Sequence, residues 1–219
     1  MTGPHLIYFA DPMCSWCWGF APVITAITQR FGDTLPVRLI LGGLRPGTTK
    51  PMDEAAKSSI REHWNHVHAA SGQPFDLHFF EREGFVYDTE PAARAVVVVR
   101  RHGMEKALAY LNLVQRAFYA ENKDVTDDEV LADLVSCVDI DRATFLRDFR
   151  SDGAKTETWD DFAITQRTGI TGFPSLIAGI GDGLEYSAVS LGYQPEDRII
   201  PPLGIWLQNY GAAVEQARV

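Results

Sequence analysis

The sequence has 219 residues, of which 46% are hydrophobic and 22% charged, so we expect one globular core with room for a large insertion. Its formal net charge of -9 argues against nucleic acid or an anionic membrane as a partner, and no apolar run approaches the roughly 18 residues of a membrane span. The opening MTGPHLIYFADP lacks the basic start and long apolar stretch of a signal peptide. We therefore expect a cytoplasmic protein.

The first elements form a strand, a helix and a second strand. HLIYFA at residues 5–10 is a short apolar run rich in β-forming residues, and it ends at Asp11-Pro12, as a buried strand before a loop would. Apolar residues then recur at helical spacing between Ser15 and Arg30, and LPVRLILGGL at residues 35–44 predicts a second buried strand. This order predicts a right-handed βαβ unit.

The middle of the chain is predicted to be helical and its end to return to the sheet. Helices are expected at residues 53–70, 90–102, 104–121, 127–137 and 141–166. PSLIAGI, a GDG turn and LEYSAVSLG predict a β-hairpin over residues 174–192, followed by a helix at 195–217. The expected fold class is α/β: a small mixed sheet from residues 1–48 and 168–219, interrupted by a helical domain at residues 49–167.

Cys14 and Cys17 lie three positions apart, directly after the first predicted strand, in a chain with three cysteines. In a reducing compartment such a pair is more often catalytic or metal-binding than a structural disulfide. The thiolate is the attacking species in disulfide exchange, and a helix N-terminus favours it at Cys14. We therefore predict that Cys14 is the nucleophile and Cys17 the resolving thiol. Ser15 and Trp16 between them carry no positive charge, which argues against an extreme oxidant.

A metal site is the chemical alternative for the cysteine pair. Zinc would need about four ligands, and Cys137, His63, His66 and His68 are the candidates that remain. Cys137 lies on an apolar helical stripe and is expected in the core, and the histidines are expected on a polar helix face. We therefore predict neither a metal nor a cofactor.

These residues resemble the DsbA family of the thioredoxin superfamily, in particular its cytosolic members predicted to be disulfide isomerases. The resemblance rests on DPMCSWCWGF after the first strand, on Pro22 eight residues beyond Cys14, and on TGFP at residues 171–174. It implies a thioredoxin-like fold with a large inserted helical domain. It also implies that Pro174 is a cis-proline facing the cysteines, with the backbone of Phe173 beside Cys14 and available to an extended substrate.

Asp11 has two interpretations. Thioredoxin-like proteins often hold a buried carboxylate near the resolving cysteine, so the resemblance makes Asp11 a candidate for proton transfer. Asp-Pro also starts turns by itself, and this interpretation stays open.

The expected function is thiol–disulfide exchange with disulfide-containing proteins or small thiols such as glutathione. One alternative is a glutathione-dependent isomerase or transferase of the kappa type, whose members typically carry serine where Cys14 lies. Another is a non-enzymatic metal or redox sensor, or an adaptor that docks partners through the helical block. A homodimer is a further hypothesis.

Overall fold

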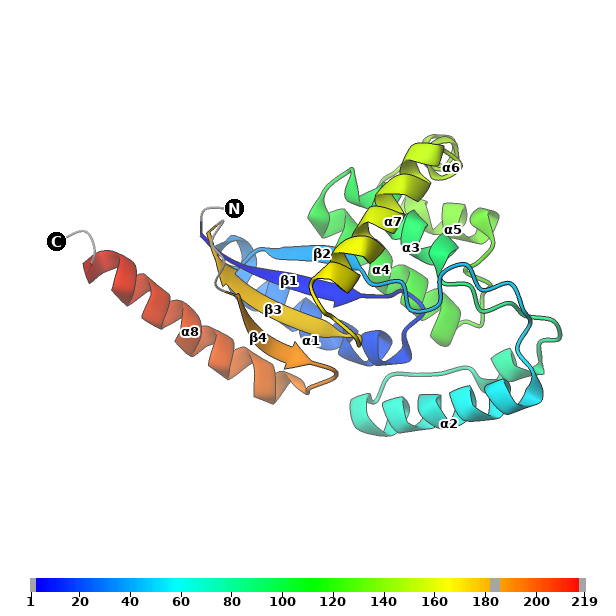
Figure 1. Cartoon of the computed structure of the whole chain (residues 1–219), viewed down its shortest axis with the longest axis horizontal. Coiled ribbons are helices and arrows are strands. Elements are labelled where there is room, and N and C mark those ends of the chain that lie inside the picture. Colours follow the sequence, from blue (N-terminus) through cyan, green and yellow to red (C-terminus); the bar gives the residue numbers. More distant parts are fainter. Residues whose placement is uncertain (1–2, 182–185, 217–219) are drawn as a thin grey trace.

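The computed structural model describes residues 3–181 and 186–216, and its centre is a four-stranded sheet in the order β2-β1-β3-β4 (Figure 1). β1 (Pro4–Ala10) pairs in parallel with β2 (Val37–Leu41) and antiparallel with β3 (Ser175–Ile180). β4 (Tyr186–Leu191) completes an antiparallel hairpin with β3. The prediction that the two ends of the chain build one mixed sheet is therefore confirmed, although Asp182 and Gly183 of the predicted GDG turn lie outside the described residues.

β1 is an inner strand of the sheet, and its side chains are buried on both faces. Leu6 and Ala10 are 0% exposed, and Phe9 on the opposite face is 2% exposed. A strand covered on both faces reads as a continuous apolar run rather than an alternating one, which explains the sequence HLIYFA. Helix α1 (Ser15–Phe31) starts shortly after β1 and packs against the rest of the core, so the cysteine pair lies at the carboxyl end of this strand.

Helices α3 to α7 lie on the β2 side of the sheet and α8 lies beside β4, whereas α2 packs against α1 (Figure 1). Their bounds are α2 (Glu54–Ser71), α3 (Glu90–Arg100), α4 (Met104–Tyr119), α5 (Asp128–Leu134), α6 (Arg142–Phe149), α7 (Asp152–Arg167) and α8 (Glu196–Gln216). Short 3-10 helices lie at η1 (Gly32–Thr34), η2 (Leu77–Glu81) and η3 (Val135–Val138). No α-helix within the described ranges is both long and apolar enough to cross a bilayer.

Two expectations for the helical region were wrong. The single helix predicted at residues 141–166 is divided into α6 and α7, because the Ser151 side chain accepts from the Ala154 backbone N–H and caps a new helix. Cys137, expected in the core, is exposed. The α-helix ends at Leu134 and η3 follows with a tighter turn, so Val135 and Val138 stay buried while Cys137 faces the surface.

A buried ion pair fastens the helical region to the sheet. The Asp161 carboxylate on α7 accepts from the Arg100 guanidinium on α3 at 2.6 and 3.1 Å, and from the Leu41 backbone N–H of β2 at 2.9 Å. Because α7 contacts both α3 and β2, the helical segment and the sheet share one hydrophobic core. The division of the chain into two domains stays a prediction.

Candidate active site

Cys14 is the N-cap of α1. Its backbone is extended, with φ -94° and ψ 116°; its N–H donates to the Asp11 carbonyl at 3.1 Å and its carbonyl accepts from the Trp18 N–H at 3.1 Å. The first turn of α1 contains no acidic residue. The positive end of the helix dipole and the unpaired N–H groups of the first turn therefore favour negative charge at the Cys14 sulfur.

The two cysteines are both free thiols but differ in access. Cys14 is 6% exposed, whereas Cys17, one turn further along α1, is 0% exposed. Burial raises the pKa of the Cys17 thiol, and the neighbouring Cys14 raises that pKa further. Cys14 is thus the thiol that another molecule can reach, and Cys17 stays protonated behind it.

The loop before β3 lies against Cys14. The Phe173–Pro174 peptide bond is cis, as the resemblance implied. The Cys14 thiol donates to the Phe173 carbonyl, with 3.6 Å between sulfur and oxygen. The Phe173 ring packs against Gly42 at the end of β2, where a Cβ atom would overlap three ring carbons. A glycine at position 42 is therefore required for this approach of the ring.

Asp11 is completely buried, and its side chain shapes the loop that precedes α1. Its two carboxylate oxygens accept from the Met13 and Leu44 backbone N–H groups, each at 2.8 Å. Burial raises the pKa of Asp11 to about 6, while these two hydrogen bonds oppose the shift. The Asp11 charge also raises the pKa of Cys17. The turn interpretation is confirmed, and the same carboxylate lies within electrostatic reach of the buried thiol.

The two tryptophans beside the cysteines have different surroundings. Trp16 is half-buried, and its ring meets the edge of His63 at 5.9 Å and tilts over Tyr193 at 5.4 Å between centroids. Trp18 is buried, stacks on Tyr119 and donates its indole N–H to the Pro74 carbonyl at 3.0 Å. Trp16 therefore belongs to the surface around the dithiol and Trp18 to the core beneath it. Ser15 is the first residue of α1 and is buried.

Two tyrosines that sequence reasoning missed contact this site. Tyr8 of β1 lies within electrostatic reach of the Cys17 thiol. The Tyr87 hydroxyl donates to the Met13 carbonyl at 2.8 Å and lies 3.4 Å from the Tyr119 hydroxyl. Burial raises the pKa of Tyr8 and Tyr87, so both stay neutral. Within HLIYFA, the polar rings of His5 and Tyr8 are the departures from an apolar run, and nothing in the sequence distinguishes Tyr8 as the one beside the dithiol.

The histidines of α2 have other contacts. His68 Nδ1 lies 2.8 Å from the Gln73 carbonyl oxygen, and His63 lies against Trp16. Over residues 3–181 and 186–216, no three His, Cys, Asp or Glu side chains are grouped as metal ligands would be.

Comparison with known proteins shows the family of this chain. The family model described as Thioredoxin matches residues 8–182, which is most of the chain. The chain belongs to the thioredoxin family. The predicted thioredoxin-like α/β fold and the resemblance to DsbA-like members are confirmed.

Two solved structures are similar over almost their whole length. A provisionally named protein disulfide isomerase from Nitrosomonas europaea is 39% identical, with 95% of this chain and 99% of that chain covered and a TM-score of 0.87. The cytosolic disulfide reductase DsbM from Pseudomonas aeruginosa is 26% identical, with 93% and 99% covered and a TM-score of 0.74. DsbM has also been solved with GSH.

A curated relative has a different role in its name. The ClpXP adapter protein SpxH from Bacillus subtilis is 26% identical over 175 residues, which are 79% of this chain and 58% of SpxH. The chain thus spans little more than half the length of that relative.

Proposed function

We propose that this protein is a thiol–disulfide oxidoreductase that reduces or reshuffles disulfides. The observation that carries the proposal is the position of the Cys14 thiol, at the N-terminus of α1 and 3.6 Å from the Phe173 carbonyl, with the Cys17 thiol buried one turn behind it. The first thiol can be approached by a substrate, and the second is held where it can attack the first.

In the first step, the Cys14 thiolate attacks one sulfur of a substrate disulfide. A mixed disulfide forms between Cys14 and the substrate, and the other substrate sulfur leaves as a thiolate that takes up a proton. In the second step, Cys17 attacks the Cys14 sulfur and expels the second substrate thiolate. The substrate gains two electrons, and the protein is left with a Cys14–Cys17 disulfide.

Asp11 is proposed to take the proton of Cys17 in the second step. A buried thiol with a raised pKa must lose its proton as it attacks, and the Asp11 carboxylate interacts with this thiol electrostatically. With a pKa of about 6, Asp11 is mostly ionised at pH 7 and can accept a proton, directly or through water.

Phe173 and Trp16 are proposed to position the substrate. An extended segment can pair with the exposed backbone before Pro174 as an added strand. Trp16 and the Phe173 ring, both half-buried, supply apolar contacts near Cys14.

Reduction is the proposed direction, and it fits a cytosolic location such as the name of DsbM gives for that relative. Ser15 and Trp16 add no positive charge that would stabilise the reduced form and make the pair strongly oxidising. DsbM, a disulfide reductase by name and solved with GSH, supports the same direction and a small thiol as electron source. Two glutathione molecules, oxidised to one glutathione disulfide, would return the Cys14–Cys17 disulfide to the dithiol. The presence of Cys14, where kappa-type transferases carry serine, disfavours that alternative.

A redox titration against glutathione buffers tests the proposal. The thiols are alkylated and counted by mass spectrometry, with Trp16 and Trp18 fluorescence as a second readout and Cys14→Ser as the control. We expect one two-electron transition with a midpoint nearer to the roughly -270 mV of thioredoxin than to the roughly -120 mV of DsbA. No transition, or no reduction of insulin by the dithiol form, would contradict the proposal.

An adaptor function is the second candidate, and the similarity to SpxH favours it. An adaptor would form a stable complex with its partner without turnover. Complex formation that persists when Cys14 and Cys17 are both replaced by serine, together with no redox transition, would support the adaptor and overturn the oxidoreductase.

A further inference from the structure

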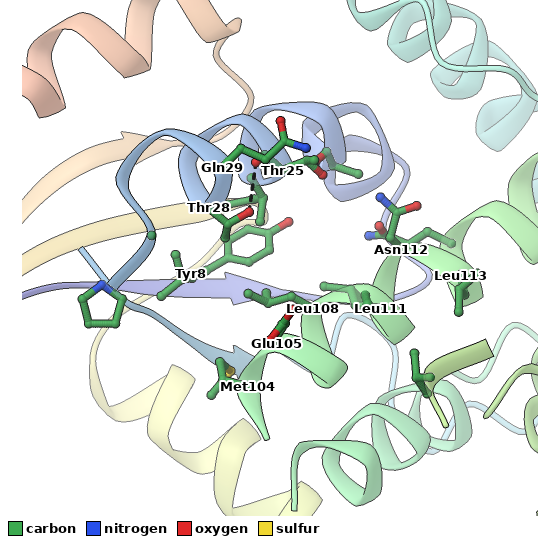
Figure 2. Close-up of a pocket in the computed structure, with 18 of the residues that line it drawn as sticks. Tyr8, Thr25, Thr28, Gln29, Met104, Glu105, Leu108, Leu111, Asn112 and Leu113 are labelled. Carbon is green, nitrogen blue, oxygen red and sulfur yellow. Dashed lines mark hydrogen bonds between the residues drawn. The ribbon is translucent and has the colours of Figure 1, made fainter. Parts of the chain in front are cut away.

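A cavity lies between α1 and α4. Its volume is about 820 Å³, within the range of small-molecule sites. It opens between the later turns of α1, η1, the start of β2 and the length of α4. Figure 2 shows residues of its two helical walls facing each other: Thr25, Thr28 and Gln29 on α1, and Met104, Leu108 and Leu111 on α4.

Tyr8 connects this cavity with the core of the site. Its ring lies between the two helices in Figure 2, and its side chain is 1% exposed. Tyr8 also lies within electrostatic reach of the Cys17 thiol, so it belongs both to the cavity wall and to the surroundings of the dithiol.

Gln115 is the unusual residue of the cavity wall. It is 1% exposed, it lines the cavity, and its Nε2 has no hydrogen-bond partner. A buried amide donor without an acceptor is costly, and an apolar residue of the same size would avoid that cost. A ligand oxygen that accepts from Gln115 would satisfy this donor.

The charges of the cavity restrict the ligand further. Among the described residues that line it, only Asp33 and Glu105 are charged, and both are acidic. Aliphatic side chains such as Ile24, Leu35 and Leu108 form much of the remaining wall. An anion would meet repulsion with no opposing cation, whereas a neutral or cationic molecule with an apolar body would not.

We propose that this cavity binds a neutral or cationic small molecule that has an apolar body and a carbonyl oxygen accepting from Gln115 Nε2. The apolar body lies between α1 and α4 beside Tyr8. A positive group, where the ligand has one, lies toward Asp33 and Glu105.

The test uses N-hexylacetamide as a probe, with hexanoate as a charge-reversed control. Methyl-labelled protein is titrated and the NMR signals of Ile24, Leu108 and Leu111 are followed. We expect saturable shifts with a Kd on the order of 1 mM, as suits a fragment of this size, and binding of hexanoate at least about tenfold weaker. This measurement needs no disulfide chemistry, so its outcome is independent of the proposed oxidoreductase function.

Two variants separate a ligand site from a structural role. Gln115→Leu removes the unpaired donor, so it should raise the Kd of the probe about fivefold while the Tm stays equal or rises. Ala109→Trp, at the exposed rim, should fill the cavity and abolish the shifts. The proposal would be overturned if the probe gave no saturable shifts up to about 10 mM, or if both variants bound it as tightly as the wild type. A Tm lowered by Gln115→Leu would overturn it as well.

Discussion

The Cys14 thiol donates a hydrogen bond to the Phe173 carbonyl, although 159 residues separate the two in the chain. Cys14 is positioned by the β1–α1 junction and Phe173 by the loop that enters β3, and the antiparallel pairing of β1 with β3 brings these segments together. The site therefore depends on the central strands of the sheet.

Replacing the buried thiol should arrest the reaction halfway. In Cys17→Ser, Cys14 remains the accessible thiol and nothing displaces the substrate from it, so mixed disulfides should accumulate. Non-reducing gels and mass spectrometry after incubation with disulfide-bonded insulin or lysozyme would detect them. Cys14→Ser is the matched control and should form none. A Cys17→Ser protein that reduces insulin at the full rate would contradict the resolving role.

Asp11→Asn should remove a pH dependence of stability. The pKa of Asp11 is raised in the folded state, so its contribution to stability is present below pH 3.8 and is lost as pH rises through about 6. That shift corresponds to about 3 kcal/mol. The free energy of unfolding is measured with urea at pH 3 and pH 7. Its decrease from pH 3 to pH 7 should be larger in the wild type than in Asp11→Asn by about this amount.

The same variant tests proton transfer. Resolution of a preformed mixed disulfide should slow by about a hundredfold, and the inflection near pH 6 in its rate should vanish. A variant that is more stable at pH 7 but keeps the wild-type rate and inflection would leave Asp11 with only its role in the turn.

Gly42→Ala should impair exchange without touching either cysteine. The added Cβ overlaps the Phe173 ring, which must shift and carry its carbonyl away from Cys14. We expect the rate of insulin reduction to fall between about tenfold and a hundredfold. Gly172→Ala is the control, because a Cβ there meets nothing within 4 Å. Equal rates for the two variants would show that the position of Phe173 does not matter.

The ion pair between Arg100 and Asp161 should affect the stability of the protein most when only one of the two partners is removed. Asp161→Leu removes the nearer carboxylate from the mostly buried Arg100 guanidinium, which then keeps Glu157 at 3.6 Å and the Leu39 carbonyl. The loss should cost about 3 kcal/mol and lower the Tm by roughly 10 °C. The double variant Arg100→Met and Asp161→Leu should recover most of this loss. Calorimetry measures both, and a double variant as unstable as the single one would show that the Leu41 hydrogen bond is the important contact.

The local elements and the dithiol could be predicted from the sequence because their signals are local. The apolar run at residues 5–10 forms β1, and the hairpin at residues 175–191 follows its two β-forming segments. The spacing of Cys14 and Cys17 places them one helical turn apart wherever α1 is packed.

Contacts between distant segments could not be predicted in this way. Ser151 divides a helix whose apolar pattern continues across it, and Cys137 is exposed because η3 turns more tightly than an α-helix. Gln115 lies on the buried side of α4. In the sequence it is a polar exception among the residues that form this buried face of the helix. Only the cavity beside it explains why that exception matters.

The sequence by itself determined the mixed α/β class, the place of the cysteine pair at the end of the first strand, and the order of its two thiols along α1. The tertiary structure decided which groups surround that pair: the carbonyl of Phe173, the buried carboxylate of Asp11 and the hydroxyl of Tyr8. The physical reason is that strand and helix signals arise from neighbours in the chain, whereas burial, and the pKa shifts that follow from it, arise from segments that the sheet brings together.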